Sequence, residues 1–479
     1  MEPNGKCPLS WGDRIDKVHE PGYMNWITTA WATMLIKQGI VLAEDAPKAA
    51  RGVLEVWERP VTEDQMGPHM HGVDRHFINT LGERAGGRLM IARTQPSSQQ
   101  MLMVRHKLMK QMCRIYDLLE AMLDRAEKHA ETIMPGYTHF RHAQPTTFGH
   151  YILSAADAIA RSTETLEHGY HLMDLCEMGC GALAGTSWPI DRDRVRKYLG
   201  MQGLIENAND AVSYTDGYLV VACGLTNVTN IASRVALDIS YWSGMEYGFL
   251  DAGSHRGTSF MMPQKEGNPN GMEFVRSRAG KMLGHLVGVA AAGQRTPHGD
   301  VFEMLHISEP VLAAFETSQI CITELATEMH RMRVHADRML AVIRESYICA
   351  TELANQIVRD QEVSYQTAHD IVNKFVLASQ EQKIPATHAR ADLLDEAAQK
   401  VLGRKLGMAE ARLRELLDPT HFIKVTNSRG GAAPDEVARM IADRRQELAD
   451  ARARHLKRIE SLENAQQKML SDLRGLCEA

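Results

Sequence analysis

Residues 257–273, GTSFMMPQKEGNPNGME, bring several chemically useful side chains onto one short segment. Ser259 supplies a hydroxyl, Lys265 a cation, Asn268 an amide and Glu273 a carboxylate. Three glycines and two prolines in this stretch exclude a regular helix, because glycine is costly inside helices and proline breaks them. A loop so dense in hydrogen-bonding groups is more typical of function than of a solvated turn. The segment therefore predicts a catalytic or binding loop.

Two further segments carry possible site residues. In residues 134–145, MPGYTHFRHAQP, Thr138 and His139 follow a Pro-Gly turn. Histidine is suited to proton transfer near neutral pH, although a single histidine in a loop is more commonly structural or simply exposed. Residues 179–192, GCGALAGTSWPIDR, are rich in small side chains. They allow either close approach of a ligand to the backbone or tight helix packing.

Composition limits the class of protein. The chain has 479 residues, 44% hydrophobic and 24% charged, which is ordinary for a soluble protein of roughly two to three domains. A net charge of −6 gives no indication of nucleic-acid binding. Cys176 and Cys180 are four residues apart, which is not the C-x-x-C spacing of zinc or redox sites. With neither a signal peptide nor a long apolar run, we expect a cytoplasmic protein with reduced thiols and no membrane partner.

Helical periodicity dominates the chain. The longest uninterrupted pattern covers residues 99–133 and ends at Met134-Pro135-Gly136. A pattern of this length is typical of a long bundle helix. Abundant methionine and few aromatic residues also favour a helical core, and convincing alternating strands are absent. Further long helices are expected at about residues 149–178, 214–248 and 271–294.

These patterns predict an all-α fold with three helical regions. We expect an N-terminal region at 1–95, a central long-helix bundle with the catalytic loop at 96–345, and a C-terminal region at 346–479. One chain does not cover every apolar stripe of very long helices, so a homo-oligomer with a multi-helix core is expected.

Four stretches, residues 134–145, 181–192, 257–273 and 421–434, resemble the aspartase/fumarase superfamily and within it most closely argininosuccinate lyase. The resemblance implies a mostly helical homotetramer, with active sites where segments of three subunits meet. It also implies elimination of a group β to a carboxylate, with release of fumarate and no metal or organic cofactor. The expected partner is a small amino-dicarboxylate substrate.

The resemblance assigns roles to individual residues. The superfamily loop reads G-S-S-x-M-P-x-K-x-N, with its first serine as the general base. Counting back from Met262-Pro263 places that serine at Ser259, and the Thr-His pair implies that His139 is the acid for the leaving amine. Preorganised donors and a cation suit the doubly charged enolate that such a reaction forms. The expected substrate-binding residues are Thr28, Arg93, Thr94, Ser97, Ser98, Gln99, Thr138, Gln144, Gln264, Lys265 and Asn268.

The chain departs from argininosuccinate lyases at both ends of the substrate site. Their R-S-R-N-D-Q segment, which binds substrate carboxylates, is replaced by residues 93–98, RTQPSS, with Gln95 and Pro96 at the Arg-Asn positions. Neither side chain carries a charge to pair with a carboxylate. Their Y-N-x-D-x-Q-E-D-K segment, which holds the arginine portion, corresponds here to residues 300–308, DVFEMLHIS. Argininosuccinate is therefore not the expected substrate.

The prediction is a carbon–nitrogen lyase that releases fumarate and an amine from an N-substituted aspartate, in either direction. Three alternatives stay open: argininosuccinate lyase proper, elimination of a non-amine group such as nitrite, and a helical structural oligomer without activity. His69, His71 and His76 lack a metal-site spacing, so no metal is predicted.

Overall fold

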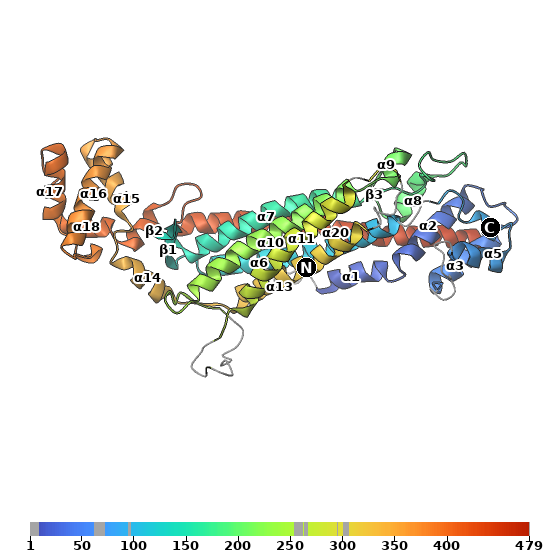
Figure 1. Ribbon diagram of the computed structural model, residues 1–479, viewed down its shortest axis with the longest axis horizontal. Coiled ribbons are helices and arrows are strands. Elements are labelled where there is room, and N and C mark those ends of the chain that lie inside the picture. The colour runs from blue at the N-terminus through green and yellow to red at the C-terminus, as the bar shows by residue number, and fades with distance from the viewer. Residues whose placement is uncertain are drawn as a thin grey trace.

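The computed structural model describes residues 9–61, 72–93, 97–252, 262, 267–294, 296–299 and 306–478. Figure 1 shows an elongated molecule in which long helices run side by side through the middle and smaller helical groups lie at the two ends. Helices make up most of the described chain, which confirms the predicted all-α class.

Five long helices form the centre of the bundle. Each packs against two or more of the others, and their buried faces belong to one hydrophobic core. They are α6 (Ser97–Lys128), α7 (Phe148–Met173), α10 (Asp216–Trp242), α11 (Asn270–Gly293) and α13 (Ser308–Arg331).

The pattern of α6 explains why it lies at the centre. Leu108, Met112, Ile115, Leu119 and Met122 recur at alternating steps of four and three residues, and all five are buried. This spacing places them on one face of a helix, so that face is driven into the core by burial of apolar area. The sequence pattern thus sets both the helix and its orientation.

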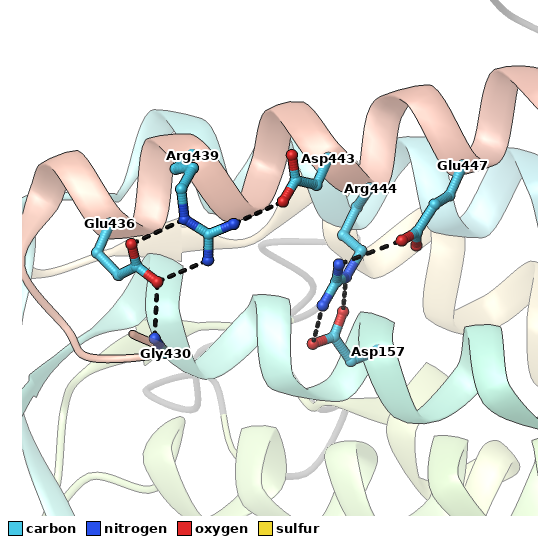
Figure 2. Close-up of polar contacts among 7 residues, drawn as sticks. All are labelled: Asp157, Gly430, Glu436, Arg439, Asp443, Arg444 and Glu447. Carbon is cyan, nitrogen blue, oxygen red and sulfur yellow. Dashed lines mark hydrogen bonds and ion pairs between the residues drawn. The ribbon is translucent and has the colours of Figure 1, made fainter. Parts of the chain in front are cut away.

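The last helix, α20 (Pro434–Glu478), returns along the whole bundle. It packs against α6 and against the N-terminal helix α3 (Ala46–Glu58). Ion pairs join α20 to α7 and also form within the first turns of α20. Arg444 binds Asp157 of α7 at 2.7 Å, and Arg439 binds Glu436 and Asp443 within α20 (Figure 2).

Smaller helices gather at the two ends of the bundle (Figure 1). At one end lie α1 (Leu9–His19), α2 (Tyr23–Lys37), α3, α5 (Gly72–Leu81), η1 (Gly86–Arg88), α8 (Arg192–Tyr198) and α9 (Ala208–Val212). Toward the other end lie α14 (Ala336–Arg344), α15 (Ala350–Gln361), α16 (Tyr365–Glu381), η2 (Ala386–His388), α17 (Ala391–Leu402), α18 (Glu410–Leu416) and α19 (Pro419–Val425).

The described residues contain more than one hydrophobic core. The main core joins residues from Trp11 to Met469, whereas a separate core between Leu353 and Leu417 holds the C-terminal helices together. The division of the chain at residues 95 and 345 stays a prediction.

The described residues also contain three short two-stranded sheets, although the sequence has no convincing alternating strands. β1 (Ile133–Thr138) pairs antiparallel with β2 (Arg141–Thr147). Proline and glycine interrupt the alternation of these strands, and the other four are only two residues long, too short for a periodic signal. These are β3 (Leu175–Cys176) with β4 (Gly203–Leu204), and β5 (Leu250–Asp251) with β6 (Arg333–Val334).

One helix within the described residues, α10, is long and apolar enough to cross a membrane by length and composition alone. Half of that apolar stretch is buried inside the protein, and α10 packs against α7, α11 and α13. This environment is that of a bundle-core helix.

Candidate functional site

The Thr138-His139 pair lies at the tip of the β1–β2 hairpin. The chain turns at His139 and Phe140, which both have positive φ, 52° and 60°. A two-residue hairpin turn favours this backbone, but bulky side chains rarely adopt it. Both residues are exposed, Phe140 to 86%. The turn itself sets this backbone, and placing a histidine and a phenylalanine there, where asparagine and glycine are usual, is typical of a functional position.

The two faces of the hairpin tip differ. The rings of Tyr137 and His142, a cross-strand pair, lie 5.3 Å apart, and Tyr137 also meets Tyr247 of the same chain at 6.5 Å. Burial raises the pKa of Tyr137 to about 12 and lowers that of His142. Thr138 and Arg141 form the next pair, and side chains of successive pairs point to opposite faces. The face with Thr138 is therefore the one turned away from Tyr247.

Side chains near the base of the hairpin connect it to the C-terminal segments. Gln144, predicted to bind substrate, donates from Nε2 to Oγ1 of Thr351 in α15 at 3.1 Å. His150, at the start of α7, contacts Thr146 through Nδ1 and the carbonyl of Gly430 through Nε2, both at 3.0 Å. These contacts hold the hairpin against the helices around it.

A second group of predicted residues lies at the N-terminal end of α6. Arg93 donates from Nη1 to Oγ1 of buried Thr28 at 3.3 Å, and its Nη2 lies 4.0 Å from Oδ1 of Asp74. Burial lowers the pKa of Arg93, and the Asp74 charge acts in the opposite direction. The structure thus brings Thr28 and Arg93 together, while their roles toward substrate stay predictions.

Ser98 and Gln99 lie in the first turn of α6. Ser98 is buried and donates to Oε1 of Glu177 at 2.6 Å, whereas Gln99 is half-buried. Ser98 therefore has an internal partner in the structure. Its role toward substrate stays a prediction, as does that of Gln99.

The two groups of predicted residues lie at opposite ends of one helix. Ser98 lies in the first turn of α6, the hairpin follows the end of this helix, and α6 has 32 residues. At 1.5 Å per residue such a helix is about 48 Å long. Figure 1 shows β1 and β2 at one end of the bundle and α2, next to the start of α6, toward the other. A single small substrate does not reach both groups within one chain.

The remaining predicted residues have limited structural description. Asn268 is exposed and lies just before α11, whose Gly271 faces Glu324 in the second half of α13. Ser97 begins α6, but its side chain lies outside the described residues, as do Thr94, Ser259, Gln264 and Lys265. Their predicted roles stay predictions.

Sequence reasoning missed three polar residues at these places. Asp74 and Glu177 belong to segments distant in sequence from their partners Arg93 and Ser98, so no local spacing indicates the contacts. Arg141 lies two residues after His139, and this position beside the Thr-His pair was the sequence feature that could have marked it as a site residue.

The described residues contain no group of three or more potential metal ligands. His69 and His71 lie outside the described residues, and His76 is in α5. A pocket of about 510 Å³ lies between α6, α7 and α20, beside the Asp157–Arg444 pair (Figure 2). It includes none of the predicted site residues.

Comparisons with known proteins place the chain among lyases. A family model described as "Lyase" matches residues 97–284. Argininosuccinate lyase from Methanosarcina mazei is 30% identical over 431 residues, which are 88% of this chain and 86% of that protein. The enzyme of the same name from Methanocaldococcus jannaschii is 29% identical over 88% of this chain and 87% of its own length.

Solved structures agree in fold. EDDS lyase in complex with formate has a TM-score of 0.83 and 26% identity, covering 99% of this chain and 96% of that one. A class II fumarase from Schistosoma mansoni, at 14% identity, has a TM-score of 0.65 over 85% of this chain and 90% of its own, which supports the fold alone. The predicted resemblance and the lyase class are confirmed. The chain belongs to the aspartase/fumarase superfamily, close to argininosuccinate lyase, and is a carbon–nitrogen lyase of the fumarate-lyase type.

Proposed function

We propose that the protein eliminates an amine from an N-substituted aspartate and releases fumarate. The observation that carries this proposal is the exposed, strained turn that presents Thr138 and His139 away from their own subunit. Strain at such a position is retained where the surrounding structure and the function require it.

The proposed chemistry uses side chains and backbone N–H groups of this protein. Ser259 removes a proton from the carbon next to a carboxylate, which leaves an enolate-like dianion. Lys265 and backbone N–H groups stabilise that charge. His139 donates a proton to the departing nitrogen as the carbon–nitrogen bond breaks, so the amine leaves neutral and fumarate remains. The reverse addition of an amine to fumarate uses the same groups in the opposite order.

We infer that the site is completed by other copies of the chain. Thr28 and Arg93 lie at one end of α6 and His139 lies beyond the other, so residues from separate subunits must meet around one substrate. An exposed apolar stripe on α11 supports such assembly. It comprises Gly280, Leu283, Gly284, Val287 and Ala291, all solvent-exposed in the single chain.

Leu283 and Val287 are 59% and 65% exposed. A bundle helix with such a stripe requires a further partner, and a homotetramer supplies identical helices for a shared core. We propose that this assembly acts in the cytoplasm.

The substrate is proposed to differ from argininosuccinate. The replacement of the carboxylate-binding segment by Gln95-Pro96 and the altered residues 300–308 both support a different leaving amine. The structural likeness to EDDS lyase, with a TM-score of 0.83, also favours a substrate other than argininosuccinate for this protein. The 30% identity to argininosuccinate lyases favours the second candidate, argininosuccinate lyase proper.

The test is release of fumarate, followed by its ultraviolet absorbance, from argininosuccinate and from a panel of N-substituted aspartates. Ser259→Ala and His139→Asn are each expected to lower kcat by about 10²–10⁴-fold. Normal turnover of argininosuccinate establishes the second candidate. Fumarate release by Ser259→Ala equal to that of the wild type overturns the assignment of the base.

A further inference from the structure

Arg141 lies beside the proposed acid on the outward face of the hairpin. It pairs across the strands with Thr138, and only His139 and Phe140 separate the two in sequence. Side chains of directly opposite residues share one face, with Cβ atoms about 4.5–5.5 Å apart. Arg141 is therefore next to a residue that the resemblance assigns to the substrate.

The other face of the hairpin is already occupied by the same chain. Tyr137 and His142 pack against each other there, and Tyr137 meets Tyr247. Because successive pairs alternate in direction, Thr138 and Arg141 point away from these rings. Both residues are solvent-exposed.

The side chain of Arg141 makes no hydrogen bond or ion pair with any other residue that the structure describes. Exposure alone does not explain this, since Arg439 is 42% exposed and still pairs with Glu436 and Asp443. Figure 2 shows that pairing, and also Arg444 bound to Asp157. The guanidinium of Arg141 therefore keeps its planar set of donors available, a geometry that matches a carboxylate in a bidentate contact.

We propose that Arg141 binds a carboxylate carried by the leaving amine, which makes the substrate an N-substituted aspartate with an acid group on its nitrogen substituent. The inference rests on the function proposed above. The neighbouring His139 protonates the departing nitrogen, so Arg141 lies on the amine side of the substrate. The succinyl carboxylates lie on the opposite side of that nitrogen.

A matched pair of substrates tests this assignment. N-(carboxymethyl)aspartate carries the acid group, and its N-(carbamoylmethyl) analogue has nearly the same shape without the charge. Arg141→Gln is expected to lower kcat/KM for the acid by about 10–100-fold, mainly through KM, because a charged hydrogen-bonded contact is lost. The effect on the amide is expected to be several-fold smaller. Arg141→Lys restores part of the preference by keeping the charge.

Arg333→Gln is the matched control, because Arg333 in β6 is also exposed and its side chain has no described polar partner. It is expected to leave both substrates unaffected. If Arg141→Gln slows both substrates equally or neither, the role of Arg141 is wrong while the lyase function stands. If the wild type releases no fumarate from either compound or from the wider panel, the proposed function is wrong, and the inference that rests on it is wrong as well.

Discussion

The Cα of Gly136 faces the backbone carbonyl of Gln144 so closely that a Cβ atom at Gly136 would lie 2.6 Å from that oxygen. The strand register also shifts between Pro135 and Tyr137, because Ala143 and Gln144 of β2 lie opposite the single residue Gly136 and form a bulge. A bulge changes the direction of the residues beyond it, and here those residues are Tyr137, Thr138 and His139. Gly136 therefore positions the tip of the hairpin through its backbone.

Gly136→Ala is expected to displace the hairpin tip while leaving the bundle folded. The new methyl group meets backbone that cannot rotate away, so the strands must separate by a few tenths of an ångström or more. Small displacements of catalytic groups cost on the order of 10²-fold in rate. We expect kcat to fall by about that factor with a stability loss of about 1–3 kcal/mol.

The control for this variant is Gly475→Ala in α20, where a Cβ atom meets nothing within 4 Å. Alanine is the better helix former by about 0.5–1 kcal/mol, so stability should rise or stay level with normal activity. Urea unfolding followed by circular dichroism gives both stabilities. Normal activity of Gly136→Ala contradicts the positioning role.

The placement of His139 and Arg93 at opposite ends of the bundle predicts complementation between inactive variants. His139→Ala and Arg93→Ala are each expected to be inactive alone. After mixing under conditions that exchange subunits, some sites combine an intact His139 from one copy with an intact Arg93 from another. Random assembly from equal amounts restores about a quarter of the wild-type activity, since each intact residue is present with a probability of about one half.

Two variants at the same end provide the contrast. His139→Ala mixed with Thr138→Val should recover nothing, because both changes fall in one hairpin and every site receives a defective one. Recovery in this second mixture, or none in the first, argues against sites shared between subunits.

If the apolar stripe on α11 is buried between copies of the chain, charged substitutions in the stripe should prevent the homotetramer from forming. Leu283→Lys combined with Val287→Lys places two charges on a surface that is proposed to be buried between copies. Burying unpaired charges is costly, so the variant should remain helical but sediment as a smaller species and lose activity. The matched control is Leu377→Lys in α16, a similarly exposed leucine at 51% that lies outside the bundle. Analytical ultracentrifugation separates the outcomes, and an unchanged sedimentation coefficient contradicts the proposed interface.

Asp472 of α20 predicts a pH-dependent contribution to stability. It accepts hydrogen bonds from Tyr198 at 2.7 Å and from Lys468 at 2.9 Å, and Lys37 lies 3.0 Å away. Partial burial raises the pKa of Asp472, but the hydrogen bonds from Lys468, Tyr198 and Lys37 outweigh it and bring that pKa to about 2. Because this pKa is below that of an unfolded aspartate, about 3.9, the stabilisation is complete above that value and is lost as the pH falls toward 2.

Asp472→Asn is therefore expected to lower the free energy of unfolding by about 1 kcal/mol at pH 7, a value reduced for solvent screening. The difference from the wild type should shrink below about pH 4. Asp443→Asn removes an exposed partner of Arg439 and should cost less than about 0.5 kcal/mol. Urea unfolding at several pH values measures each difference, and a constant gap for Asp472→Asn contradicts the pKa shift.

Much of the fold follows from local sequence. The three- and four-residue spacing of apolar side chains in α6 predicts a long helix with one buried face, and Met134-Pro135-Gly136 predicts where it ends. The Thr-His pair of the hairpin also stands out, because its types and order match a reaction class. These features depend on residues close together in the chain, so the sequence alone determines them.

Tertiary structure alone decides the rest. The contact of Ser98 with Glu177, the approach of Asp74 to Arg93, and the return of α20 along the bundle join segments far apart in sequence. No periodic pattern encodes such contacts, because they depend on how whole helices pack. The length of α6 can be predicted from the sequence. That length separates His139 from Arg93 only because the folded helix is straight and the two residues lie near its opposite ends. The residue types available for chemistry are thus set by the sequence, whereas packing between distant helices decides that the two groups of predicted site residues lie apart in each chain.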